Sequence, residues 1–211
     1  MASEIRSVTE FDSIELKGVG DLHVEQGEQE TLRIEGDDEV IRQIITEVSN
    51  RRLVIRFDTW TALRMWGTSQ KVAFHITVKE LTHVTISGSG SLDLAHFKTE
   101  SLDLSLTGAG SITADVEVSK LQAGVAGSGD FTVKGSAKEV DIRITGAGSF
   151  RGLGLEGQDV RVSIGGAGKA SVKAEATLDV QIGGAGSVEY LGTPALTQKI
   201  GGIGKIERAA V

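Results

Sequence analysis

The sequence predicts an all-β protein, a right-handed parallel β-helix (solenoid) with about 18–20 residues per coil and an irregular β segment near its N-terminus. Two observations predict this class. A Gly-x-Gly unit recurs at nearly constant spacing, and apolar residues alternate with polar or small ones around each unit. A fixed spacing of this length is typical of repeat proteins, whereas a period of two is the pattern of a β-strand and not of a helix.

The repeat occurs eight times. Seven regular copies lie between residues 84 and 208, and one further copy stands apart at residues 14–24. The first glycines of the regular copies follow one another at nearly equal steps: Gly88, Gly108, Gly127, Gly146, Gly166, Gly184 and Gly202. An aliphatic residue stands two positions before the first glycine in every copy: Leu16, Ile86, Leu106, Val125, Ile144, Ile164, Ile182 and Ile200. Stacked copies would therefore place like side chains on like.

A single copy is too small to fold alone. About five buried apolar side chains contribute roughly 10 kcal/mol, whereas ordering a backbone of ~19 residues costs at least ~20 kcal/mol. Stacking overcomes this cost, because neighbouring copies share one core and bond each other's backbone amides. The glycines fall on inward-facing positions, where a tight corner accepts only glycine. Right-handed winding is expected, because the aliphatic residues do not recur every six positions as in hexapeptide solenoids.

Residues 25–80 interrupt the repeat and are predicted to form irregular β rungs. Apolar residues alternate there too, and Asp37 and Asp38 precede an apolar pair in a way that favours one short, capped helical turn. A longer helix over 38–48 is the alternative. We expect this segment to cap the N-terminal end of the solenoid and cover a sheet edge. The regular repeats at 81–208 end without an obvious cap, so the last copy is a candidate contact for another chain. Residues 1–211 are predicted to form one domain.

Composition excludes several classes of protein. The chain has 211 residues, with 28 glycines but one proline, which excludes collagen, and without cysteine it has neither disulfides nor thiolate metal sites. The net charge of −7 gives no overall attraction to nucleic acid or to an anionic membrane. No run of apolar residues is long enough to cross a bilayer, so direct membrane insertion is not expected. The start lacks the pattern of a secretory signal, so the protein is extracytoplasmic if a leader was removed and cytoplasmic otherwise.

The repeats and the segment before them resemble a known family. Units of the form [IV]-x-[LI]-[ST]-G-[AS]-G-[SD], preceded by TLRIEG, VIRQIITEV, LVIRF and ITVKEL, are similar to the putative autotransporter-adhesin head GIN domain family of bacteria, whose function is unknown. The resemblance covers roughly residues 5–208. It implies a β-helical fold and, often, an envelope or exported location. The family supplies no catalytic residues to look for.

The glycine-rich strings do not carry the chemistry that they superficially suggest. Residues 165–170 resemble a phosphate-binding loop, but Ala170 stands where a magnesium-ligating Ser or Thr is required. Residues 183–188 begin like a calcium β-roll, but Val188 replaces the ligating aspartate. Outward-facing carboxylates do not recur in one register: Asp130, Asp141, Asp159, Asp179 and Glu189. The histidines have no metal-like spacing: His23, His75, His83 and His96. We therefore predict no catalytic, cofactor-binding or metal site, and no enzyme.

The segment 58–67 holds the residues that we single out for interaction. Trp60 and Trp66 are the only tryptophans, and Arg64 lies between them. Tryptophan and arginine are frequent anchors of protein interfaces, but the favoured alternative is that one or both tryptophans plug the end of the solenoid. Small residues between the paired glycines form a second, weaker candidate for an interface.

Three functions are compatible with these features. The first is a non-enzymatic structural or adhesion-type module of the bacterial cell envelope that binds protein, glycan or itself. The second is a cytoplasmic scaffold that assembles end to end through its last repeat. The third, a glycan-active enzyme, requires paired carboxylates in a groove. The partners expected are another copy of the chain or a surface ligand, and no cofactor.

Overall fold

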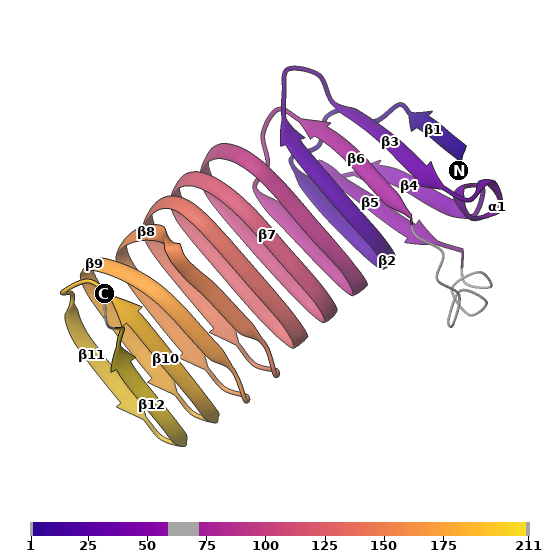
Figure 1. Cartoon of the computed structure of the whole chain (residues 1–211). Coiled ribbons are helices and arrows are strands. Elements are labelled where there is room, and N and C mark those ends of the chain that lie inside the picture. Colours follow the sequence, from indigo (N-terminus) through magenta and orange to yellow (C-terminus); the bar gives the residue numbers. More distant parts are fainter. Residues whose placement is uncertain (1, 59–71, 210–211) are drawn as a thin grey trace.

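The computed structural model describes residues 2–58 and 72–209, which form an all-β fold with one short helix (Figure 1). The strands are β1 (Ala2–Arg6), β2 (Ser13–Gln26), β3 (Thr31–Gly36), β4 (Ile44–Ser49), β5 (Arg52–Phe57), β6 (Ala73–Val78), β7 (His83–Ile144), β8 (Ser149–Ile164), β9 (Lys169–Ile182), β10 (Ala185–Leu191), β11 (Ala195–Ile200) and β12 (Ile203–Arg208), and the helix is α1 (Asp38–Ile41). The hydrogen-bonded order β1-β3-β6-β2-β7-β8-β9-β10-β12 runs along the length of the molecule, from the N-terminal to the C-terminal end.

The repeats stack in parallel and in register. Phe131 pairs with Phe150, which is the equivalent residue of the next copy, and β10 pairs with β12 in the same way at the end of the chain. The isolated copy joins the same stack, because β2 pairs in parallel with β7 from Ser13 to Glu25 without a shift in register. One step of the predicted repeat along the sequence therefore leads from a strand to its neighbour in the stack.

The first glycine of each of the seven regular repeats is required by the backbone of the repeat before it. Gly88 and Gly108 have positive φ angles of 141° and 128°, a conformation that other residues rarely adopt. A Cβ atom at Gly108 would overlap the carbonyl oxygen of Gly88. The sequence predicted that a side chain at this position would collide with the core. At the first glycine the neighbouring backbone occupies that space, because bends of successive repeats lie directly on one another. At the second glycine the prediction is confirmed, since a Cβ atom at Gly168 would meet the core side chain of Ile144 at 2.6 Å.

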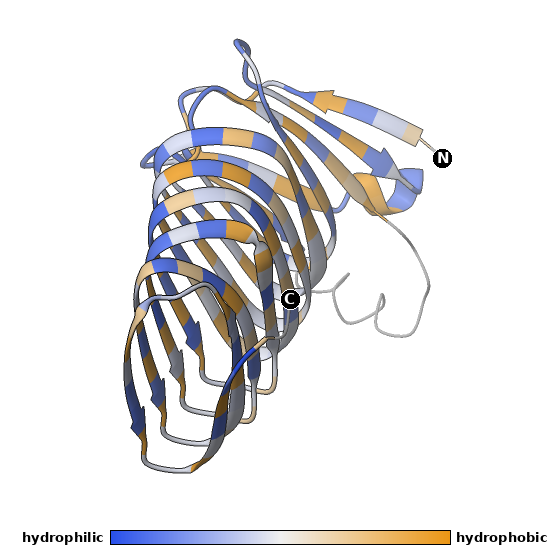
Figure 2. Ribbon diagram, turned by 60° about the vertical axis from the view of Figure 1, so that its left-hand side comes forward, coloured by the Kyte–Doolittle hydropathy of each residue, from blue (hydrophilic) through white to orange (hydrophobic). Residues whose placement is uncertain are grey.

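The core consists of the inward-facing side chains of all repeats. Hydrophilic and hydrophobic residues alternate along the strands in Figure 2, and the hydrophobic members are the buried ones. The column two residues before the first glycine is fully buried at Leu106 and Ile144, but Ile200 at the C-terminal end is 43 % exposed. Among the described residues, the buried side chains are all hydrophobic. The stack of repeats therefore stabilises itself by apolar burial between neighbours.

Residues 25–80 form the N-terminal end of the molecule, and they depart from parallel stacking. β5 and β6 continue the parallel stack beside the two halves of β2, but β1 with β3, β3 with β6, and β4 with β5 pair antiparallel. The helix is a single turn that Asp37 caps by accepting a hydrogen bond from the Glu39 amide at 3.0 Å, so the short helical turn is confirmed and the longer helix over 38–48 is wrong. Arg6 donates to the carbonyl oxygens of Ile41 and Ile44 and thereby joins β1 to this end.

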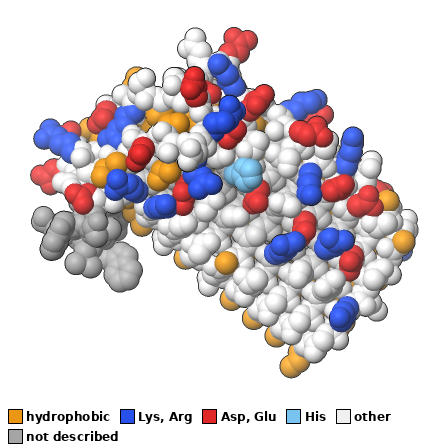
Figure 3. All heavy atoms as spheres, turned by 180° about the vertical axis from the view of Figure 1, so that it is seen from behind, with side chains coloured by type: hydrophobic (Ala, Val, Ile, Leu, Met, Phe, Trp, Pro, Cys, Tyr) orange, Lys and Arg blue, Asp and Glu red, His pale blue; other side chains and the backbone are white. Residues whose placement is uncertain are grey.

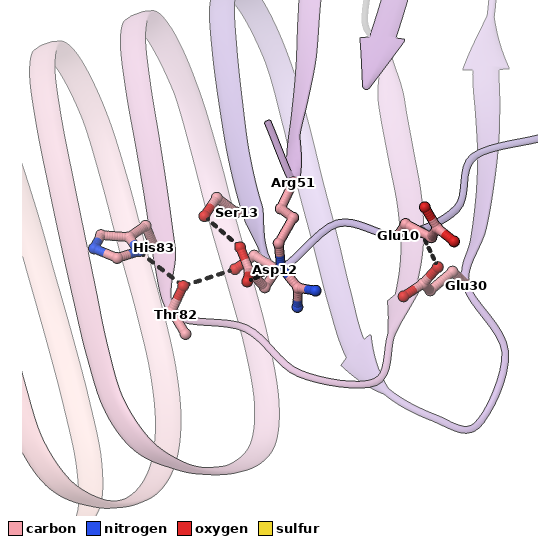
Figure 4. Close-up of polar contacts among 7 residues, drawn as sticks. All are labelled: Glu10, Asp12, Ser13, Glu30, Arg51, Thr82 and His83. Carbon is pink, nitrogen blue, oxygen red and sulfur yellow. Dashed lines mark hydrogen bonds and ion pairs between the residues drawn. The ribbon is translucent and has the colours of Figure 1, made fainter. Parts of the chain in front are cut away.

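Asp12 connects this N-terminal end to the first repeats (Figure 4). Its carboxylate accepts hydrogen bonds from Arg51 Nε at 2.6 Å and from the Ser13 hydroxyl at 2.9 Å. Its carbonyl oxygen accepts from the backbone amide and the hydroxyl of Thr82. Partial burial raises the pKa of Asp12, but the hydrogen bonds and the positive charge of Arg51 outweigh it, so the pKa lies below its usual value. The side chain and the carbonyl oxygen of this one residue thus join the starts of β2, β5 and β7.

Candidate functional site

Five neighbouring strands, β1, β3, β6, β2 and β7, form one sheet at the N-terminal end. Register places one residue from each strand in a single row across it, in the order Ile5 (β1), Arg33 (β3), His75 (β6), His23 (β2) and Asp93 (β7). We call this row the five-strand face. In β3, β6, β2 and β7 the residue of the row directly follows a buried residue, so its side chain points away from the core, and Ile5 lies on the same face because it pairs in register with Arg33. Segments that are far apart in the sequence thus meet at one surface.

Two histidines lie at the centre of the five-strand face. The rings of His23 and His75 stack with their centroids 5.1 Å apart and an angle of 17° between their planes. On one side, Glu35 lies 3.2 Å from His75 Nε2 and 2.7 Å from Arg33 Nη1. Register places Asp93 beside His23 on the other side. The face therefore presents a flat imidazole pair between an arginine and carboxylates.

The five-strand face is hollowed and has unused hydrogen-bonding capacity. A depression of about 510 Å³ is lined by its five residues together with Glu25 and Thr77 from the next row. Within residues 2–58 and 72–209, the side chains of His23 and Asp93 have no hydrogen-bond or ion-pair partner. Ile5, 77 % exposed, adds an apolar side chain at the rim. Convergent donors and acceptors of this kind suit a polar ligand.

A second, shallower depression of about 220 Å³ lies on the outer surface of the regular repeats. It brings together three of the carboxylates considered in the sequence, Asp141, Asp159 and Asp179, with Arg161 between two of them in register. The Arg161 side chain lies 3.6 Å from Asp179, and Arg143 lies 3.1 Å from Asp141. Arginines hold Asp141 and Asp179, and the Thr177 hydroxyl donates a hydrogen bond to Asp159, so each of the three carboxylates has a partner within the protein. Carboxylates held in this way do not favour the acid and nucleophile roles of a glycosidase.

The other sequence-based expectations concern an interaction site, metal ligands, surface charge and membrane-spanning segments. Trp60, Arg64 and Trp66 lie outside the described residues, so the predicted interaction site stays a prediction. In the described part of the chain, no three histidine or acidic side chains are arranged to hold a metal ion. Over the face of the molecule drawn in Figure 3, positive and negative side chains are intermingled. None of the described helices is long and apolar enough to span a membrane.

Sequence reasoning missed the histidine pair. His23 and His75 are far apart in the chain, and their linear spacing carries no signal. The signal was their position in the alternating pattern. His23 directly follows buried Leu22, His75 directly follows buried Phe74, and these two buried residues pair in register. Recognising it required knowing that β6 lies beside β2 rather than further along the stack.

Comparison with known proteins agrees with this architecture. Residues 10–194 match the family described as "Putative auto-transporter adhesin, head GIN domain". Crystal structures with the same fold include a putative adhesin from Bacteroides fragilis, 24 % identical with a TM-score of 0.91, and one from Parabacteroides distasonis, 24 % identical with a TM-score of 0.76. A putative lipid binding protein from Parabacteroides distasonis is 18 % identical, with a TM-score of 0.70. Each comparison covers 99 % of this chain and 96 % of the other. Among curated proteins, no match was found.

Proposed function

Because the chain belongs to the family of putative autotransporter adhesins with a head GIN domain, we propose that it is a non-enzymatic, adhesion-type module of the bacterial cell envelope. Its ligand, a glycan or a protein surface, binds at the five-strand face. The observation that carries this proposal is the row of side chains from Ile5 to Asp93, which combines a hollow with donors and acceptors that the protein leaves unpaired.

The fold that serves this function is, in the proposal, a right-handed parallel β-helix. Support comes from the parallel registers that advance by one copy of the repeat at a time and from the bends that lie over one another at the first glycines. Such a stack holds its surface side chains at fixed spacing, because neighbouring strands lie about 4.8 Å apart. A rigid surface loses little conformational entropy when it binds, which favours recognition by an exposed sheet.

The experiment compares binding of the purified chain to immobilised mucin and to the same mucin after deglycosylation. Arg33→Ala and His23→Ala are expected to weaken binding by about tenfold, because each removes a central side chain of the face. Arg143→Ala is the matched control, since Arg143, like Arg33, pairs with a carboxylate two residues away but lies on the repeats. Loss of binding after deglycosylation identifies a glycan, and retained binding with the same variant sensitivity identifies a protein surface. Equal behaviour of all three variants would overturn the assignment of the face.

The other candidate functions have less support. The fold of a putative lipid binding protein resembles this one, but the inward positions here are filled by buried hydrophobic side chains, and charged side chains line both hollows described above. The arginine-paired carboxylates do not favour glycan hydrolysis. End-to-end assembly requires a contact at the C-terminal end of the stack, where the geometry permits a specific proposal.

A further inference from the structure

The C-terminal end of the stack exposes residues that are buried one repeat earlier. Leu196 and Ile200 of β11 are 38 % and 43 % exposed, while Leu178 and Ile182, their partners in register on β9, are at most 1 % exposed. Ile206 of β12 is only partly buried, whereas its partner Val188 on β10 is 1 % exposed. The two sets of side chains differ because no further strand covers β11 and β12 within the described part of the chain.

The backbone N–H and C=O groups of β11 and β12 point alternately toward the preceding repeat and toward the open edge. In β12, the amides of Ile203 and Ala209 donate to carbonyl oxygens of the preceding repeat, so the odd-numbered residues direct their backbone groups inward along the stack. The backbone groups of Gly204, Ile206 and Arg208 therefore point outward at the open edge. In β11, the Gly201 amide donates to Ile182, so by the same alternation Gln198 lies at the centre of that strand's open edge.

We propose that this edge pairs with the same edge of a second copy, so that two chains form a tail-to-tail dimer with antiparallel β12–β12 and β11–β11 pairing. The two β12 strands form hydrogen bonds only where outward-pointing residues of both copies lie opposite each other. This leaves three central registers, in which the two-fold axis passes through Lys205, Ile206 or Glu207. A register centred on Lys205 places two lysines opposite each other, and one centred on Glu207 places two glutamates together. The register centred on Ile206 places Lys205 opposite Glu207 of the other copy, twice.

The charges of β12 thus select one register, and the same two-fold axis suits β11. A Cβ atom at Gly204 would meet the side chain of Ile182, in the preceding repeat, at 2.8 Å, so the column of aliphatic residues before the bend faces the column of second glycines across the core. Two residues farther from the bend on each strand, Gln198 faces Ile206. An axis through Ile206 therefore passes through Gln198 and places Leu196 opposite Ile200 of the other copy. The exposed apolar side chains cover each other, and the two Gln198 amides meet, each able to donate and accept.

This contact is closed rather than open-ended. An isologous interface uses the same surface of both copies and leaves neither free for a third. The N-terminal end has a different structure, in which α1 and the Arg6 hydrogen bonds join β1 to β4. The proposal therefore replaces the expected end-to-end filament with a dimer that carries its two five-strand faces at opposite ends. It is independent of what those faces bind.

The test measures the oligomeric state of the complete chain by sedimentation across a range of concentrations. Wild type is expected to dimerise reversibly. Lys205→Glu and Glu207→Lys are each expected to weaken the dimer by about tenfold, because each creates two like-charge contacts, and the combined exchange is expected to restore affinity to within about threefold. Lys205 and Glu207 form an exposed ion pair in one chain, so thermal unfolding of each variant monitors the monomer.

A proline provides an independent test of the pairing. Gln198→Pro removes an amide that the single chain leaves unpaired and blocks the edge, so it is expected to abolish dimerisation while the thermal midpoint stays within a few degrees. Ile5→Ser, which changes an exposed apolar residue at the other end, is the control and should leave the dimer unchanged. A chain that stays monomeric at every concentration, a dimer that the charge exchange does not restore, or one that Ile5→Ser weakens would each overturn the proposal.

Discussion

At the scale of single residues, the first glycine of each regular repeat is required by the repeat before it. We predict that Gly108→Ala lowers the free energy of unfolding by about 3 kcal/mol, because a methyl group would overlap the Gly88 carbonyl oxygen at a φ of 128°. Gly165→Ala is the matched control, since a Cβ atom there has no neighbour within 4 Å and the change is expected to lie within about 0.5 kcal/mol. Urea unfolding of both variants checks the difference, and equal losses would contradict the stacking constraint.

Asp12 provides a residue-scale prediction of acid sensitivity. Partial burial raises its pKa, but the Arg51 interactions lower it by more, so the folded pKa lies below the unfolded one. Its contribution to stability is therefore complete above the unfolded value of about 3.9 and is lost as pH falls through the folded pKa. Asp12→Asn is expected to cost about 1–2 kcal/mol at pH 7 and to flatten the decline of stability below pH 4. Asp38→Asn, in an exposed ion pair with Arg42, should leave that decline unchanged in thermal unfolding measured from pH 7 to pH 2.5.

At the scale of elements, the repeats were predictable and their N-terminal neighbours only in part. Alternation around Gly108 or Gly146 identifies strands, and constant spacing identifies their partners, because each strand pairs with the next copy of itself. Residues 31–57 have the same alternation but no repeat to indicate a partner. Their antiparallel pairing is decided by tertiary contacts, such as those of β3 with β6. β1 was not predicted, since Ala2–Arg6 has one apolar side chain of any size and depends on β3 for its conformation.

Arg6 is expected to hold β1 in place. It donates to Ile44 at 2.6 Å and to Ile41 at 3.0 Å, and it contacts the Thr46 hydroxyl at 3.2 Å. Arg6→Ala should therefore increase amide hydrogen exchange in β1 and β3 by at least about tenfold, because local opening no longer breaks these bonds. Exchange in β8 and β9 should not change. Faster exchange throughout the chain would show instead that β1 belongs to the same cooperative unit as the repeats.

The sequence could indicate the candidate site only where it also indicated which strands are neighbours. The five-strand face combines β1, β3, β6, β2 and β7, and its row is fixed by pairings between segments that carry no common motif. The charged network at Asp141, Arg161 and Asp179 was within reach, because these residues stand in equivalent positions of successive repeats. Small differences in length between the copies concealed that register in the linear sequence.

At the scale of the whole molecule, the cost of losing a core side chain should depend on its position in the stack. Leu178 and Leu196 are partners in register, but Leu178 is fully buried and Leu196 is 38 % exposed. In dilute solution, Leu178→Ala is expected to lower the free energy of unfolding by about 3 kcal/mol and Leu196→Ala by about 1 kcal/mol or less. Nearest-neighbour coupling causes this difference, because Leu196 has a covering repeat on one side only.

Protein concentration then distinguishes an open end from a paired one. If two copies meet tail to tail, Leu196 packs against Ile200 of the partner, and the cost of Leu196→Ala should rise toward that of Leu178→Ala as concentration increases. The cost of Leu178→Ala should stay constant, because its neighbours belong to the same chain. Denaturant titrations of both variants at low and high concentration measure this difference. A cost for Leu196→Ala that does not change with concentration would mean that the terminal repeat keeps its apolar side chains in water, and the stack would end as a monomer.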